Sequence, residues 1–180
     1  MSGRLRFRRV LLGVHQNVPD SAALGFAAGF AESLHLEMLA MIVEEPRITN
    51  LAGLPHIREF RMLDAKWQPL DISRMAKEFD SATEAARRLL TFAAASHRIS
   101  CAVEVVRAGS HQAVRTFSQS TDIIILAEPK SPIDRIVGSF PEFSSAALQS
   151  EAAILYAPRS IRRHRGSVVA IAATPVVPSI

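Results

Sequence analysis

Short apolar runs alternate along this chain with longer segments in which apolar residues recur every three or four positions. Five of the runs are bounded by polar or turn-forming residues and predict strands buried on both faces of a sheet. These strands are expected at Val10–Val14, Leu39–Val43, Cys101–Val106, Ile123–Ala127 and Ala153–Tyr156. The helical periodicity predicts helices from Asp20 or Ser21 to Leu34, from Ile72 to His97, from Ser110 to Phe117 and from Glu142 to Gln149.

The order of these elements predicts an α/β fold with an open, parallel five-stranded sheet and helices on both faces. In such sheets, ligands bind beyond the carboxyl ends of the strands, near the point where the strand order reverses. The loops after Val14, Val43, Val106 and Ala127 are therefore the expected places for a binding site. Residues 46–71 are irregular and rich in proline, and predict either a functional lid or a short helix.

Composition agrees with a single soluble domain. The chain has 180 residues, of which 48% are apolar and 21% charged, within the range of globular proteins. No apolar run approaches the roughly 20 residues that span a bilayer, and the N-terminal run is too short for a signal peptide, so a cytoplasmic location is expected. The single cysteine, Cys101, excludes an internal disulfide and is expected to be a buried filler residue.

Positive charge is concentrated at the two ends of the chain. Eight of the 21 basic residues are arginines within residues 1–9 and 159–165, and all 17 acidic residues lie between these segments. Such ends suit contact with phosphates or an acidic membrane surface, but solvated tails are the simpler interpretation. Phe7 is the only aromatic residue among these arginines, so no stacking platform for nucleic acid is indicated.

Four segments, taken in order and with their spacing, resemble the universal stress protein family. They are Val10–Ser21, Leu39–Pro46, Val103–Ala113 and Thr121–Pro158. The resemblance covers about Arg9–Arg159 and implies a binding or regulatory module of the stress response, over residues 1–158, that is not an enzyme. Residues 159–180 then form a basic linker and an extra strand, which resembles the first strand and also fits the start of a second repeat.

Members of this family that bind ATP carry G-x2-G-x9-G-[S/T] after the fourth strand and an acidic residue at the end of the first. Gly138-Ser139 fits the end of that pattern, but Ile125, Ala127 and Glu128 stand where glycines are expected, and His15 replaces the acidic residue. The resemblance therefore implies a degenerate nucleotide cleft. Its candidate residues are His15, Val43, Ala127, Lys130, Gly138 and Ser139.

Two interpretations of this cleft stay open. The preferred one is a module with no cofactor and no ATP turnover, in which His15 is a plain loop residue and Ser139 a helix cap. The alternative is that ATP or AMP is held by an atypical loop, through Ser139, Lys130 and main-chain atoms near Val43. A nucleotide-dependent enzyme is a third interpretation, but the sequence contains no Walker loop, G-x-G-x-x-G fingerprint or nucleophile elbow.

A homodimer is the expected assembly. The last strand of the domain, Ala153–Tyr156, is expected at a sheet edge, and the extra strand Val168–Ala173 can cross to a neighbour. Edge strands leave N–H and C=O groups that a partner strand satisfies. A different protein partner is the alternative.

Overall fold

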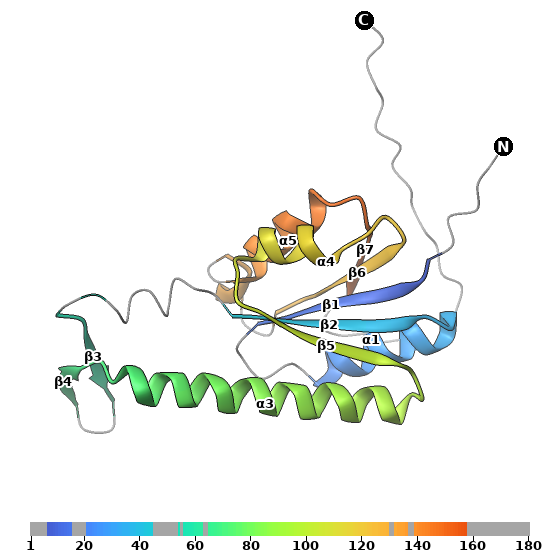
Figure 1. The fold of residues 1–180 in the computed structure, drawn as a ribbon. Helices are drawn as coiled ribbons and strands as arrows, with labels where there is room; N and C mark the ends of the chain where they lie inside the picture. The colour runs from blue at the N-terminus through green and yellow to red at the C-terminus, as the bar shows by residue number, and fades with distance from the viewer. Residues whose placement is uncertain are drawn as a thin grey trace, which may run out of the picture.

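The computed structural model describes residues 7–15, 21–44, 54, 56–62, 65–129, 132–136 and 139–157. Its centre is a five-stranded parallel sheet of strand order β5-β2-β1-β6-β7 (Figure 1). The strands are β1 (Arg9–His15), β2 (Glu37–Val43), β5 (Cys101–Val106), β6 (Asp122–Ala127) and β7 (Ala153–Ala157). The predicted fold class is confirmed.

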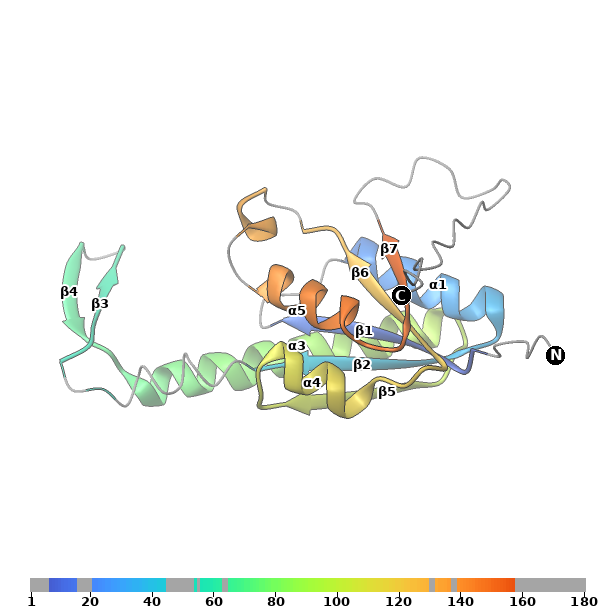
Figure 2. The same ribbon diagram turned by 90° about the horizontal axis from the view of Figure 1, so that it is seen from above.

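Helices cover both faces of the sheet. Helices α1 (Ser21–Leu34) and α3 (Ile72–Ser96) lie on one face, and α4 (Ser110–Phe117) and α5 (Ser139–Leu148) lie on the other (Figures 1 and 2). A short 3-10 helix, η1 (Ile133–Arg135), precedes α5. Helix α3 begins where the sequence pattern predicts, because the side chain of Asp71 accepts a hydrogen bond of 3.0 Å from the backbone N–H of Arg74.

Each face of the sheet has its own hydrophobic core. Leu90 and Ala94 of α3 join the cluster under α1, whereas Ala113 of α4 and Phe143 of α5 join the cluster on the opposite face. Every residue of β2 from Met38 to Val43 is buried, as expected for a central strand of a sheet covered on both sides.

Gly13 of β1 lies directly beneath the ring of Phe143. A Cβ atom at Gly13 would stand 2.3 Å from Cζ of that ring, closer than any real carbon contact. The absence of a side chain in mid-strand therefore allows α5 to settle on the sheet.

The expectation of a short helix within residues 46–71 is wrong for the part that the structure describes. Strands β3 (Arg58–Arg61) and β4 (Lys66–Pro69) form an antiparallel hairpin there. In β4, apolar and polar residues alternate, which is the period of a strand. β3 has a single apolar residue, Phe60. Most of the remainder of residues 46–71 lies outside the described residues.

Helix α3 is longer than the sheet is deep. Its 25 residues extend about 37 Å at 1.5 Å per residue, whereas the longest strands extend about 23 Å. Only Ala86, Leu90 and Ala94 of α3 are buried, and all lie in its second half. Met75 and Phe79 fall in the half that overhangs the sheet and are only partly buried. The hairpin lies at the free end of this overhang (Figures 1 and 2).

Arg9 is a structural residue and not part of a solvated tail. It opens β1, and its Nε and Nη2 donate hydrogen bonds of 2.8 and 3.0 Å to the carboxylate of Asp122, which is fully buried at the start of β6. Residues 1–6 and the predicted linker and extra strand of residues 159–180 lie outside the described residues. In the part that is described, no helix is both long and apolar enough to cross a membrane.

Candidate functional site

The topology brings three predicted site residues to one edge of the sheet. His15 ends β1 and lies in register with Val43, which ends β2, and Ala127 ends β6 on the other side of β1. The chain order runs from β1 through β2 to β5 on one side and then returns to β6 and β7 on the other. The strand order therefore reverses between β1 and β6, which is where such sheets bind ligands.

These residues offer a ligand little side-chain chemistry. Val43 is 1% exposed, and its side chain belongs to the core, so only its main-chain atoms are available at the edge. Ser139 is partly buried and is the first residue of α5, which places its hydroxyl at a helix N-terminus, where anions are favoured. Lys130, Gly138 and the side chain of His15 lie outside the described residues.

The end of β6 carries a carboxylate. Glu128 follows Ala127, is mostly buried, and forms an ion pair with Arg135 of η1. Its backbone N–H donates a hydrogen bond of 2.9 Å to the carbonyl of Ala157, so that N–H is not available to a phosphate. A second carboxylate, Glu142, stands in the first turn of α5. Both negative charges oppose a polyphosphate at this position.

Glu44, the residue after β2, lies at the carboxyl edge and is not among the residues that the sequence predicts for the site. Its carboxylate accepts a hydrogen bond of 3.0 Å from the hydroxyl of Thr83 in α3 and another of 3.0 Å from Nε of Arg107 after β5. Glu44 also donates its backbone N–H to the carbonyl of Val106, at 2.9 Å. These bonds join β2, β5 and α3 at the carboxyl edge, so Glu44 positions the edge. A charge in the turn after a buried strand was the only sequence signal for it.

Ser110 places an unused hydroxyl at the same edge. It is the first residue of α4 and is 1% exposed, and its Oγ has no hydrogen-bond partner among the residues that the structure describes. It shares the inner face of α4 with Ala113 and Val114, so it faces the sheet. A buried polar group without a partner is costly, and in a binding site it is a group left open for a ligand or water.

Two further residues that could carry chemistry, Cys101 and His97, are held in structural contacts. Burial raises the pKa of the Cys101 thiol, which keeps it protonated and poorly nucleophilic near neutral pH. His97 lies 2.7 Å from a carboxylate oxygen of Glu32 and caps α3. Among the described residues, no group of three or more histidine, cysteine, aspartate or glutamate side chains is placed to hold a metal ion.

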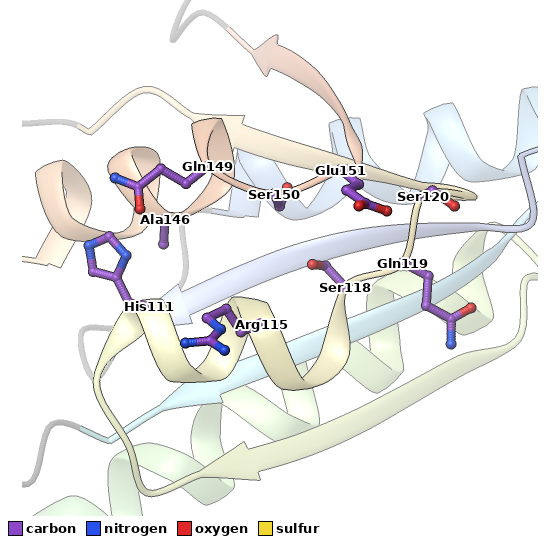
Figure 3. Close-up of a pocket in the computed structure, with 9 residues that line it drawn as sticks. All are labelled: His111, Arg115, Ser118, Gln119, Ser120, Ala146, Gln149, Ser150 and Glu151. Carbon is purple, nitrogen blue, oxygen red and sulfur yellow. The ribbon is translucent and has the colours of Figure 1, made fainter.

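A groove lies between α4 and α5, on the face of the sheet that these two helices cover (Figure 3). Its volume is about 350 Å³. His111 and Arg115 line it from α4, whereas Gln149 and Glu151 line it from the end of α5 and the turn that follows. It combines basic, acidic and amide groups and contains none of the predicted site residues.

Solved structures share this architecture. Universal stress protein UspA from Lactobacillus plantarum superposes with a TM-score of 0.54 at 20% identity, covering 84% of this chain and 97% of that one. The chain has the fold of the universal stress proteins. A universal stress protein in complex with cAMP superposes with a TM-score of 0.51 at 12% identity, over 86% of this chain and 99% of that one. A protein of the universal stress protein family from Burkholderia pseudomallei superposes with a TM-score of 0.50 at 16% identity, over 87% of this chain and 98% of that one.

No protein-family model and no curated protein matches the sequence. The universal stress protein likeness therefore lies in the fold, at sequence identities of 20% or below for these three structures.

Proposed function

We propose that this protein is a divergent universal stress protein that acts in the cytoplasm as a binding or regulatory module and does not turn over ATP. The observation that carries the proposal is the ion pair between Glu128 and Arg135 at the carboxyl end of β6. In family members that bind ATP, glycines in this region let backbone N–H groups approach the phosphates. Here a carboxylate stands there, and its own N–H is bonded to Ala157.

The electrostatics support this proposal. A phosphate held at the N-terminus of α5, where helices favour anions, would stand near Glu142 of the first turn. Arg135 is the nearest described cation to Glu128 and is already paired with it. A phosphate that recruited Arg135 would compete with the mostly buried Glu128 carboxylate for it, and breaking an ion pair of a mostly buried carboxylate is unfavourable.

The test is release of phosphate from Mg-ATP by the purified chain, with the variant Glu128→Gln beside it. We expect no release above the protein-free background for either protein. A rate that rises in proportion to protein concentration contradicts the proposal, and loss of that rate in Glu128→Gln would show that the activity belongs to this edge.

A second candidate is binding of a nucleotide with a single phosphate group, such as AMP or cAMP, without turnover. A structural neighbour was solved in complex with cAMP, and the unpartnered Ser110 hydroxyl and the α5 N-terminus at Ser139 both lie at the carboxyl edge. Mass spectrometry of small molecules released on denaturing the purified protein discriminates the two. Release of an adenine nucleotide in stoichiometric amount favours this candidate. If no nucleotide is released, the result favours the ligand-free module.

The proposed assembly is a homodimer through the β7 edge. β7 is the terminal strand of the sheet, as the sequence predicts, and Ile154 and Tyr156 are exposed on it. An unpaired edge with apolar side chains is a template for a partner strand. Substituting Tyr156→Lys is expected to weaken the dimer in light scattering, and a monomeric wild-type chain at tens of micromolar contradicts the assembly.

A further inference from the structure

The β3–β4 hairpin presents large apolar side chains to solvent. It lies at the free end of α3, away from the body of the domain (Figures 1 and 2). Phe60 is 49%, Trp67 60% and Met62 88% exposed. These are large apolar side chains on a ribbon that no other described strand flanks.

The two faces of the hairpin differ. On one face, Glu59 accepts a hydrogen bond of 2.7 Å from Gln68 and forms an ion pair with Arg74 of α3, so this face is tied to the helix. On the other face, Phe60 and Trp67 lie opposite each other, with ring centroids 5.3 Å apart. The aromatic face is turned away from α3.

A two-stranded hairpin is marginally stable alone, and three or more strands are usually needed for independent stability. Both outer edges of this hairpin also carry backbone groups that β3 and β4 do not pair with each other. Another strand added at one edge would supply the third strand and pair the backbone groups of that edge. The identity of that strand follows from the sequence of β3 itself.

Two copies of β3 can pair edge to edge in one favourable way. Consider two β3 strands paired antiparallel about a two-fold axis perpendicular to the ribbon. Residues directly opposite each other in an antiparallel pair have their side chains on the same face, so the residue at the axis must be paired with the same residue of the second copy. Three of the four residues of β3, Arg58, Glu59 and Arg61, are charged and would oppose a like charge. Only Phe60 can occupy the axis, and in that register Glu59 lies opposite Arg61 of the second copy, twice over. Opposite charges and aromatic pairs at directly facing positions stabilise sheets.

The other edge is less suitable. β4 has the sequence Lys-Trp-Gln-Pro, and Pro69 has no N–H to donate to a neighbouring strand. Placing Trp67 on the axis would oppose Lys66 with Gln68, which adds no charge pair. Self-pairing is therefore expected at β3.

We infer that β3 is a self-association edge, at which a second copy of this chain pairs through a two-fold axis at Phe60 to form a four-stranded aromatic ribbon. This interface is separate from β7, which lies at the edge of the main sheet. A chain that uses both edges forms assemblies larger than a dimer. Loss of the β3 contact then lowers the mass to that of the β7 dimer, or of the monomer if β7 does not associate.

The charge at the axis gives a sharp test. Phe60→Lys and Phe60→Glu each place two like charges opposite each other, and each is expected to weaken the β3 association about tenfold or more. Mixing the two variants in equal amounts opposes Lys with Glu and should restore the mass. Because Phe60 is on the exposed face and Glu59 keeps Arg74 and Gln68 as partners, the hairpin itself should stay folded. Light scattering and sedimentation velocity report the mass.

The register is tested separately with Arg61→Glu, which sets Glu59 opposite a like charge on the second copy. Arg61 also lies 3.7 Å from Glu59 of its own chain, so the matched control is Arg87→Glu on α3, where Arg87 lies 3.6 Å from Glu84. Trp67 is the only tryptophan, so its emission reports the ribbon directly and should shift to the blue with rising wild-type concentration, but not in Phe60→Lys. An unchanged mass in Phe60→Lys, or no recovery on mixing, overturns the inference. A wild-type shift of Trp67 that occurs only on anionic vesicles also overturns it, in favour of a membrane partner.

Discussion

Replacing Asp122 by asparagine removes the charge from one partner of the buried pair that joins the first and sixth strands. The Asp122 carboxylate is fully buried and accepts hydrogen bonds from Nε and Nη2 of Arg9, at 2.8 and 3.0 Å, and from the backbone N–H of Gln119, at 2.7 Å. An asparagine of the same shape keeps one acceptor oxygen. Its amide group then faces either Nε of Arg9 or both Nη2 of Arg9 and the backbone N–H of Gln119, so at least one donor stays unpaired.

The size of the effect follows from burial. Breaking a buried ion pair by removing one partner costs about 3–5 kcal/mol. The Arg9 side chain is 26% exposed, so water partly solvates the orphaned guanidinium, and we expect a loss of about 2–4 kcal/mol for Asp122→Asn. For a domain of this size, a loss of about 3 kcal/mol lowers Tm by about 6–12 °C.

Urea and thermal unfolding followed by circular dichroism measure this loss. Arg9→Met completes a double-mutant cycle with Asp122→Asn, and Arg88→Met, on the exposed face of α3, is the matched control for loss of an arginine. The sum of the stability losses of the two single variants should exceed the loss of the double variant, because both single variants remove the same hydrogen bonds. A loss below about 1 kcal/mol for Asp122→Asn, or strict additivity in the cycle, would refute the reasoning.

Two further outcomes are expected. Gly13→Ala should destabilise the fold by about 1–3 kcal/mol through overpacking, because the new Cβ would meet the Phe143 ring at 2.3 Å. Adding Phe143→Leu should recover part of this loss in urea unfolding. If the losses of the two variants simply add, the predicted clash is contradicted. The hydrogen bond from Gln68, followed by nearby arginines, lowers the pKa of Glu59 below its ordinary 4.5. The stabilisation that ionised Glu59 gives the hairpin is therefore present above pH 4.5 and lost as the pH falls through the folded-state pKa. Trp67 emission should change on acidification below pH 4.5. Emission that stays constant well below that pH argues against the contacts of Glu59 with Gln68 and Arg74.

The sequence predicts the main sheet well because its central strands, β1, β2 and β6, are buried on both faces. Continuous apolar runs such as Leu39–Val43 carry that signal locally, and the βα alternation then determines parallel pairing. The same rule correctly brings His15, Val43 and Ala127 to one edge. It does not reveal that the Val43 side chain is committed to the core, since that depends on the register of three strands.

Other features depend on contacts between distant residues. Arg9 reads as part of a basic tail because its partner, Asp122, is 113 residues away. The β3–β4 hairpin has short strands with only Phe60 and Trp67 as large apolar residues, and its inner face is held by Glu59 to Arg74, 15 residues on. Local periodicity carries no information about either contact, so an irregular segment and a solvated end were the natural predictions.

Calorimetric titration of the full chain with Mg-ATP tests the central claim most directly. With Glu128 and Arg135 paired at the end of β6 and Glu142 at the start of α5, we expect a Kd weaker than about 10 µM, or a binding free energy less favourable than about −7 kcal/mol. Tighter binding, if abolished by Ser139→Glu at the N-terminus of α5, would contradict the account and place ATP at the carboxyl edge of the sheet.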